Sequence, residues 1–291
     1  MFKGSFVALV TPFTNGEIND DEYQSFVDWQ VNEGTHGLVP CGTTGESPTM
    51  SHGEHKHVTE LCIEAAAGRV PVVAGAGSNS TAEAVDLATH AEATGADAIL
   101  VVSPYYNKPT QAGLFAHYEA INNAVGLPII VYNIPGRSIV NIDIGTMKKI
   151  SALSNVVGVK DATADLSLPA QVRREIGADF CQLSGEDATV IPFLAAGGHG
   201  CISVTANVAP ALCAEQHNAW NRGDVAGAQA VQDKLVNLHQ AMFCESSPGP
   251  AIYAVKLLGF CSDEMRLPLV GISDASKAQV EAAVFELGLL G

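Results

Sequence analysis

The chain has 291 residues and a formal net charge of −16, from 15 Lys and Arg against 31 Asp and Glu. This acidity argues against a nucleic-acid partner and against an anionic-membrane partner. A hydrophobic fraction of 47% is enough to build a large core, and the length fits one large α/β domain or two smaller domains. The composition therefore predicts a folded globular protein rather than a disordered one.

The N-terminus and the cysteines indicate a reducing compartment. The first strand is expected only a few residues after the start of the sequence, without the architecture of a signal peptide. The seven cysteines are odd in number and include no CxxC pair, as is typical of reduced core thiols. Apolar runs have the length of strands and are interrupted by Gly or Pro, so no membrane span is expected. We therefore expect a cytoplasmic protein.

Strand-like and helix-like stretches alternate along the first 223 residues. Amphipathic helices are expected at residues 20–32, 51–67, 80–94 and 110–125, with capping boxes at Ser51-x-x-Glu54 and Ser80-x-x-Glu83. The expected strands are eight short, mostly apolar runs: Ser5–Val10, Gly37–Pro40, Val70–Ala74, Ala98–Val102, Pro128–Tyr132, Val156–Lys160, Phe180–Leu183 and Gly200–Val204.

Such alternation indicates a parallel α/β sheet, and eight strand–helix units are the number that closes a (β/α)8 TIM barrel. An open doubly wound sheet is the alternative, but no GxGxxG opening supports it. After residue 223 the strands stop, and helices are expected at residues 224–240, 249–258 and 276–287. We predict a barrel over residues 1–223 and a C-terminal helical appendage over residues 224–291, packed on the barrel or on another subunit.

The strand that ends in Lys160 is the first candidate for chemistry. Residues 155–160 are rich in valine and are expected to be buried, where a lysine is costly to place. Desolvation disfavours the ammonium form, and a neutral amine is a nucleophile that forms a Schiff base with a ketone. The alternative is that Lys160 simply pairs with a carboxylate such as Asp161.

Tyr132 and Arg137 favour the functional interpretation of Lys160. If neighbouring strand ends are level, Tyr132 and Lys160 point into the same barrel mouth, where Gly158 leaves room. A phenol beside a neutral amine is a proton shuttle for forming and dehydrating a carbinolamine. Arg137, in the loop above, offers a two-pronged donor to a carboxylate. These residues follow the ends of separate strands, where barrel enzymes carry their sites.

Three other loops leave alternatives open. The run Cys41-Gly42-Thr43-Thr44-Gly45-Glu46-Ser47 is a backbone-rich pocket for a carboxylate or an ordinary glycine turn, and it lacks the lysine of a Walker loop. Tyr105 and Tyr106 are site residues or surface packing at an interface. Glu186 and Asp187 are expected to cap a helix.

The histidines do not favour a metal site. His52, His55 and His57 lie near the start of a helix, but HExxH is absent, so a polar first turn is preferred. His199 lies among glycines and is expected to be a turn residue. We expect no metal and no cofactor.

Five motifs together carry a family resemblance: Gly42–Glu46, Pro104–Asn107, Tyr132–Arg137, Gly158–Thr163 and Leu183–Gly185. Over essentially the whole chain, the sequence closely resembles the dihydrodipicolinate synthase family of pyruvate-dependent class I aldolases. The resemblance implies a lyase of lysine and diaminopimelate biosynthesis. Lys160 would form a Schiff base with pyruvate, and the enamine would add to L-aspartate 4-semialdehyde.

The resemblance also implies roles for other residues. Thr43, Tyr132 and Tyr106 match the proton relay of the family, with Tyr106 supplied by a neighbouring subunit. Thr44 would hold the carboxylate of pyruvate, and Arg137 the carboxylate of the semialdehyde. The implied assembly is a homotetramer, a dimer of dimers. Two further residues would line the site: Gly185 and Ile202.

Feedback inhibition by L-lysine is a further implied feature. Pro48 and Ser80 replace the small apolar residues expected near the effector site, and Pro48 removes a donor and stiffens its loop. The matching effector positions are Ser47, His52, His55, Asn79, Glu83 and Tyr105. The alternatives at this point are a relative that cleaves N-acetylneuraminate or a keto-deoxy sugar acid, a metal-dependent aldolase, and a non-catalytic barrel.

Overall fold

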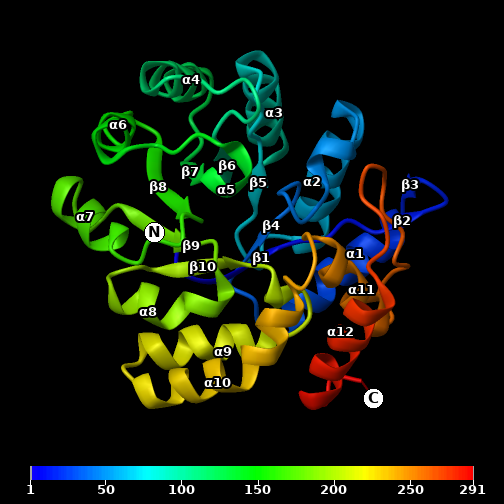
Figure 1. Ribbon diagram of the computed structural model, residues 1–291. Coiled ribbons are helices and arrows are strands. Elements are labelled where there is room, and N and C mark those ends of the chain that lie inside the picture. The colour runs from blue at the N-terminus through cyan, green and yellow to red at the C-terminus, as the bar shows by residue number, and fades with distance from the viewer. Residues whose placement is uncertain (1, 291) are drawn as a thin grey trace. The chain divides into compact units, whose positions relative to one another are not determined.

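The computed structural model describes residues 2–290 of the chain. Eight parallel strands alternate with helices along these residues (Figure 1). This is the element order of a (β/α)8 TIM barrel, and the predicted fold class is confirmed. The described residues form two compact units: unit 1 contains residues 2–3 and 71–202, and unit 2 contains residues 4–70 and 203–290.

Unit 1 contains a run of hydrogen-bonded parallel strands in the order β10-β9-β8-β7-β6-β5. Most residues of these strands are buried on both faces, which is why they read as continuous apolar runs in the sequence. The strand bounds are β5 Val73–Gly75, β6 Ala98–Val102, β7 Ile129–Asn133, β8 Val156–Asp161, β9 Cys181–Ser184 and β10 Gly200–Ser203. The last residue of β10 belongs to unit 2.

The helices of unit 1 lie outside its strands, as α3, α4, α6 and α7 show in Figure 1. Their starts follow the expected chemistry at Thr110 and Asp143, whose side chains accept hydrogen bonds from backbone N–H groups of the first turns of α4 and α6. The bounds are α3 Thr81–Thr94, α4 Gln111–Ala124, α5 Pro135–Ser138, α6 Ile144–Ile150, α7 Leu168–Glu175, the 3₁₀ turn η2 Asp187–Thr189, and α8 Val190–Ala195.

The predicted capping box at Ser80 is wrong. Ser80 is the residue before α3, but its side chain accepts no capping hydrogen bond. The Ser78 hydroxyl instead donates to the Glu83 carboxylate at 2.7 Å and accepts from the Ser80 N–H at 3.0 Å. The Ser78 hydroxyl therefore takes the place of the Ser80 backbone N–H as the donor to the Glu83 carboxylate, and no capping box forms.

Gly158 permits a close approach of β8 to β9, and this differs from the expected role of making room near Lys160. A Cβ built on Gly158 would lie 2.5 Å from the carbonyl oxygen and 2.6 Å from the Cβ of Cys181. Gly158 and Cys181 are register partners in these strands, so the clash would be with the backbone of the neighbouring strand.

Gly158→Ala should therefore destabilise the protein by about 1–3 kcal/mol, as overpacking of a closed core does. The measurement is the midpoint of urea or thermal unfolding. The matched control is Gly271→Ala, because a Cβ at Gly271 meets no atom within 4 Å; this change should stay within about 0.5 kcal/mol. Equal midpoints for the two variants would contradict the close-approach explanation.

Unit 2 combines one parallel strand pair, one hairpin and most of the longer helices. Strands β1 Gly4–Ala8 and β4 Gly37–Val39 pair in parallel. Strands β2 Phe13–Thr14 and β3 Glu17–Ile18 form an antiparallel hairpin, which was not predicted from the sequence. The helices are α1 Asp20–Asn32, η1 Ser47–Thr49, α2 His52–Ala66, η3 Thr205–Asn207, α9 Pro210–Asn221, α10 Val225–Ala241, α11 Gly249–Leu257 and α12 Asp274–Glu286. The predicted capping box at Ser51 and Glu54 is confirmed.

The C-terminal helices match the predicted ones closely. Helix α10 packs against α9, and α12 packs against both α10 and α11 (Figure 1). The packing of α10 on α9 crosses the predicted boundary at residue 223, and the division into a barrel and an appendage stays a prediction.

Within residues 2–290 none of the seven cysteines forms a disulfide, and five of them are buried. This is the reduced state expected from their spacing. None of the helices in the described part of the chain has the length and apolar character of a membrane span.

Candidate active site

Lys160 and Tyr132 lie side by side at the ends of two neighbouring strands of unit 1. They are register partners between β7 and β8, and the Lys160 Nζ atom lies 4.3 Å from the centroid of the Tyr132 ring. Both side chains are buried, with 6% and 5% of their residue surface exposed. The expected juxtaposition of a buried amine and a phenol is therefore confirmed.

Asp161 does not serve as the partner of Lys160. Successive residues of a strand point to opposite faces, and Asp161 lines a small pocket with Asn133 and Met147. One of its carboxylate oxygens accepts from the Thr163 N–H at 2.8 Å. Burial raises the pKa of the Asp161 carboxyl, and the hydrogen bonds from Thr163 lower it in part. The alternative of a simple ion pair with Asp161 is therefore wrong.

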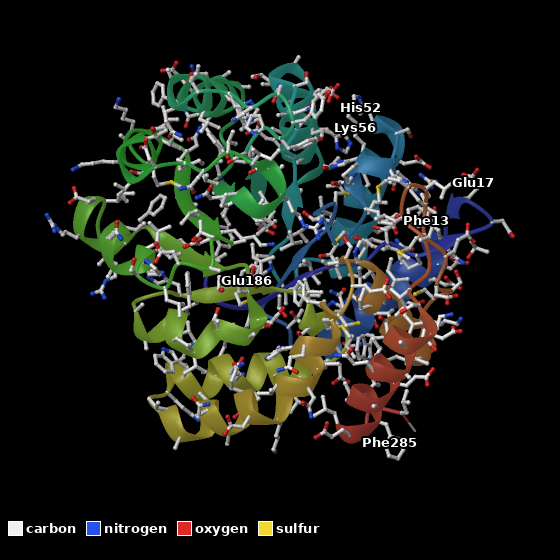
Figure 2. The ribbon with its side chains drawn as sticks, in the orientation of Figure 1. Phe13, Glu17, His52, Lys56, Glu186 and Phe285 are labelled. Atoms are coloured by element: carbon white, nitrogen blue, oxygen red, sulfur yellow. The ribbon has the colours of Figure 1, made fainter. Side chains whose placement is uncertain are left out.

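Glu186 is partly buried, and its predicted role as a helix cap is wrong. It precedes η2, but its side chain makes no capping hydrogen bond; Figure 2 labels it just after β9. Burial raises the pKa of Glu186, the neighbouring Asp187 raises it further, and the positive charge of Lys160 opposes both. Its position directly after a strand end, where site residues of barrels lie, was visible in the sequence but did not distinguish a cap from a site residue.

The remaining site residues of unit 1 lie at the ends of strands or in the loops after them. The Gly185 N–H donates to the Asp161 carbonyl at 2.7 Å, and a Cβ at Gly185 would lie 2.7 Å from that of Ala162. Ile202 is fully buried in β10. Arg137 is exposed on the short helix α5.

Tyr106 has an unusual position. Its residue surface is 87% exposed, and its backbone has a φ of 71°, in the left-handed region that disfavours a bulky residue. Strained backbone of this kind clusters at functional sites. Tyr106 is thus directed outward from the chain that carries it.

The segment Cys41–Glu46 of unit 2 forms a tight loop. The residues at its two ends, Cys41 and Glu46, have φ values of 54° and 56°, and both are buried. The N–H groups of Gly45 and Glu46 donate to the carbonyls of Gly42 and Thr43 at 3.2 Å. Within this tight loop, Thr44 is 4% exposed and Thr43 is partly exposed.

Glu46 is a buried acid at the end of the same loop. It is 1% exposed, and burial raises the pKa of its carboxyl to about 6. Its Oε2 atom accepts from the backbone N–H of Arg266 at 3.2 Å, whereas Oε1 has no hydrogen-bond partner among the described residues.

The residues expected to bind an effector belong to both units. In unit 1, the Asn79 carbonyl accepts from the Asn107 side chain at 2.8 Å, and Glu83 accepts from Ser78. In unit 2, His55 is buried on α2 and His52 is exposed one turn before Lys56 (Figure 2). The remaining two, Ser47 and Tyr105, are partly exposed.

The other histidines have structural contacts. His57 Nε2 lies 2.8 Å from the Asp20 carboxylate. His199 Nδ1 accepts from the Gln182 N–H at 3.1 Å, and the His199 N–H donates to the Gln182 carbonyl at 2.8 Å. His199 therefore pairs with β9 just before β10, and the expected turn role is wrong. Among residues 2–290, no group of three His, Cys, Asp or Glu side chains has a metal-binding arrangement.

Comparison with known proteins covers the whole chain. A model of the dihydrodipicolinate synthetase family matches residues 1–287. A 4-hydroxy-tetrahydrodipicolinate synthase of Rhodospirillum centenum is 60% identical over 290 residues, which is 100% of both chains.

Two solved structures have the same fold. A dihydrodipicolinate synthase of Acinetobacter baumannii complexed with pyruvate is 39% identical, with a TM-score of 0.96 over 99% of this chain and 100% of the other. One from Cyanidioschyzon merolae with lysine bound is 36% identical, with a TM-score of 0.96 over 99% of each chain. With a family model that spans nearly every residue and a relative that matches from end to end, this chain belongs to the dihydrodipicolinate synthetase family.

Proposed function

We propose that the chain is a 4-hydroxy-tetrahydrodipicolinate synthase, a lyase that condenses pyruvate with L-aspartate 4-semialdehyde in lysine and diaminopimelate biosynthesis. The observation that carries the proposal is the buried amine of Lys160, 4.3 Å from the Tyr132 ring at the ends of β7 and β8. The relative that matches over its full length carries the name of this enzyme.

In the proposed reaction, the amine nitrogen of Lys160 attacks the carbonyl carbon of pyruvate and forms a carbinolamine. The carbinolamine loses water when a proton reaches its hydroxyl group, and Tyr132 supplies that proton. Loss of water gives the Schiff base, and the deprotonated Tyr132 then takes up a proton from the methyl group of the Schiff base to give an enamine. The enamine carbon attacks the aldehyde carbon of the semialdehyde. Tyr132 exchanges its proton with Thr43 and with Tyr106 of a neighbouring subunit.

Two residues bind the carboxylates of the substrates in this proposal. Thr44 holds the carboxylate of pyruvate, to which its hydroxyl can donate a hydrogen bond. Arg137 binds the carboxylate of the semialdehyde, because its planar fork can donate two parallel hydrogen bonds. Gly185 and Ile202 line the site.

We extend the proposal to assembly, regulation and location. The exposure and the strained backbone of Tyr106 favour a tyrosine donated to a second copy within a homotetramer, a dimer of dimers. The lysine-bound relative supports L-lysine as an effector. The effector positions in this chain are Ser47, His52, His55, Asn79, Glu83 and Tyr105. The free thiols favour the cytoplasm.

The test is turnover with pyruvate and a panel of aldehydes: L-aspartate 4-semialdehyde, N-acetylmannosamine and sugar aldehydes that give keto-deoxy acids. We expect efficient condensation with the semialdehyde and little with the sugars. Turnover with a sugar and none with the semialdehyde would overturn the proposal. Titration of L-lysine into the productive reaction tests the effector separately.

A further inference from the structure

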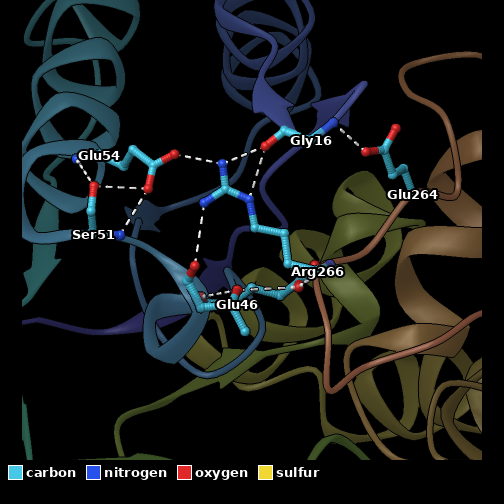
Figure 3. A network of polar contacts seen from close by, with 7 residues as sticks. Gly16, Glu46, Ser51, Glu54, Glu264 and Arg266 are labelled. Carbon is cyan, nitrogen blue, oxygen red and sulfur yellow. Dashed lines mark hydrogen bonds and ion pairs between the residues drawn. The ribbon is translucent and has the colours of Figure 1, made fainter.

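Arg266 lies in the segment between α11 and α12 and contacts three segments near the N-terminus (Figure 3). Its Nε and Nη2 atoms donate to the Gly16 carbonyl at 3.1 Å and 2.6 Å. Its Nη1 atom donates to the Thr49 carbonyl at 3.3 Å, and Nη2 also donates to the Glu54 carboxylate. Each nitrogen of the guanidinium group is therefore engaged.

These contacts are more than a surface ion pair. The Arg266 side chain is only 17% exposed and that of Glu54 27%, and the guanidinium carbon lies 4.4 Å from the centroid of the Phe13 ring. The hydrogen bond from Arg266 lowers the pKa of Glu54 to about 2. A planar group with several aligned donors is geometrically specific, and lysine cannot replace it.

The contacts of Arg266 lie at the C-terminal end of the loop that carries Thr43 and Thr44 and in the segment after it. Its backbone N–H donates to Glu46, the residue that ends this loop in a left-handed conformation. Its guanidinium group binds the carbonyl of Thr49 in η1, directly after the loop, and Glu54 in the first turn of α2.

The partners of Arg266 are themselves held in place. Glu54 Oε2 accepts from the N–H and the hydroxyl of Ser51, both at 2.8 Å, and so closes the capping box of α2. Glu264 accepts from the N–H groups of Asn15 and Gly16 in the turn of the β2–β3 hairpin. The turn that presents the Gly16 carbonyl to Arg266 is thereby fixed as well.

A left-handed conformation at a non-glycine residue is unfavourable and persists only where the surroundings impose it. Cys41 and Glu46 bound the loop in this conformation. Arg266 and its acceptors supply the surroundings at the Glu46 end.

We propose that Arg266 is a positioning residue that presets the hydroxyl of Thr44 for pyruvate, and that of Thr43 for proton transfer, by fixing the segment from Glu46 to Glu54. This inference rests on the proposed function, because that function assigns Thr44 to the pyruvate carboxylate and Thr43 to the proton relay. Arg266 touches no substrate in this account and acts through the loop.

The test compares Arg266→Met with Arg222→Met. Arg222 forms an exposed ion pair with Glu215 at 2.6 Å in the same unit, so its replacement removes an arginine ion pair without touching the loop. For Arg266→Met we expect the KM for pyruvate to rise about tenfold and kcat to fall about tenfold, because small misplacements of positioning groups have effects of this size. The KM for the semialdehyde should stay within about twofold, since Arg137 lies on a different segment.

Unchanged kinetic constants in folded Arg266→Met, with only a lower Tm, would show a merely structural role and overturn the inference. If Arg266→Met does not fold, Arg266→Lys and Glu54→Gln test the inference instead, since each keeps part of the hydrogen-bond network of Arg266. Both should raise the KM for pyruvate, and unchanged constants in both would contradict the inference. Activity of the unmodified protein and of Arg222→Met tests the proposed function itself, so the two failures are distinguishable.

Discussion

Lys160→Arg should lower kcat by at least about 10³-fold, as loss of an enzyme's nucleophile does. The guanidinium group keeps a positive charge near the Tyr132 ring but stays protonated at every working pH. It therefore cannot add to the carbonyl of pyruvate. The measurement is steady-state condensation of pyruvate with L-aspartate 4-semialdehyde, with circular dichroism to verify folding.

The matched control is Lys148→Arg in the same unit. Lys148 is exposed on α6, 3.3 Å from the carboxylate of Glu175, and arginine can maintain that ion pair. Its kcat should stay within about twofold, because exposed ion pairs contribute little. Retention of more than a tenth of the activity in Lys160→Arg would contradict the role of Lys160.

Tyr132→Phe should lower kcat by about 10²–10⁴-fold, which is the usual contribution of a general acid or base. The variant keeps the ring that lies 4.3 Å from Lys160 and removes only the phenolic oxygen. Binding of pyruvate should change little, and the lost step is dehydration of the carbinolamine. Steady-state kcat and the rate of adduct formation together distinguish a loss of dehydration from a loss of pyruvate binding.

Tyr118→Phe provides the opposite expectation from the same chemical change. The Tyr118 hydroxyl is buried and donates to the Val101 carbonyl at 3.0 Å. Its removal should cost about 1 kcal/mol of unfolding free energy and leave kcat within about twofold. If Tyr132→Phe also lost stability but kept its kcat, Tyr132 would be a packing residue.

The sequence was sufficient to predict the part of the site that depends on strand order. Alternating strands and helices place consecutive strands side by side, and the prediction assumed that the ends of β7 and β8 are level. The register confirms that assumption at Tyr132 and Lys160, although it shifts by one residue between Ile129 and Ile130. Strand order is why the pairing of Tyr132 with Lys160 was predictable. The exposure and the backbone strain of Tyr106 were not, because no residue pattern encodes a left-handed tyrosine.

Contacts between distant segments could not be predicted. Arg266 and Gly16 are 250 residues apart, and the β2–β3 hairpin that presents Gly16 has strands of only two residues, too short to give a periodic signal. The sequence also did not show that the Ser78 hydroxyl donates to the Glu83 carboxylate, which a capping box at Ser80 would need as its acceptor. Glu186 was assigned to a cap because the sequence does not show how near it lies to Lys160. Glu186 follows β9 and Lys160 lies on β8, so the effect of one charge on the other depends on how these strands are placed.

The most direct measurement is reduction of the protein with borohydride in the presence of pyruvate, followed by peptide mass spectrometry. We predict one reduced pyruvate adduct, on Lys160, which is absent when pyruvate is omitted and absent in Lys160→Ala. An adduct that persists in Lys160→Ala, or no adduct in a protein that condenses the two substrates, would contradict the assignment of Lys160 as the Schiff-base lysine.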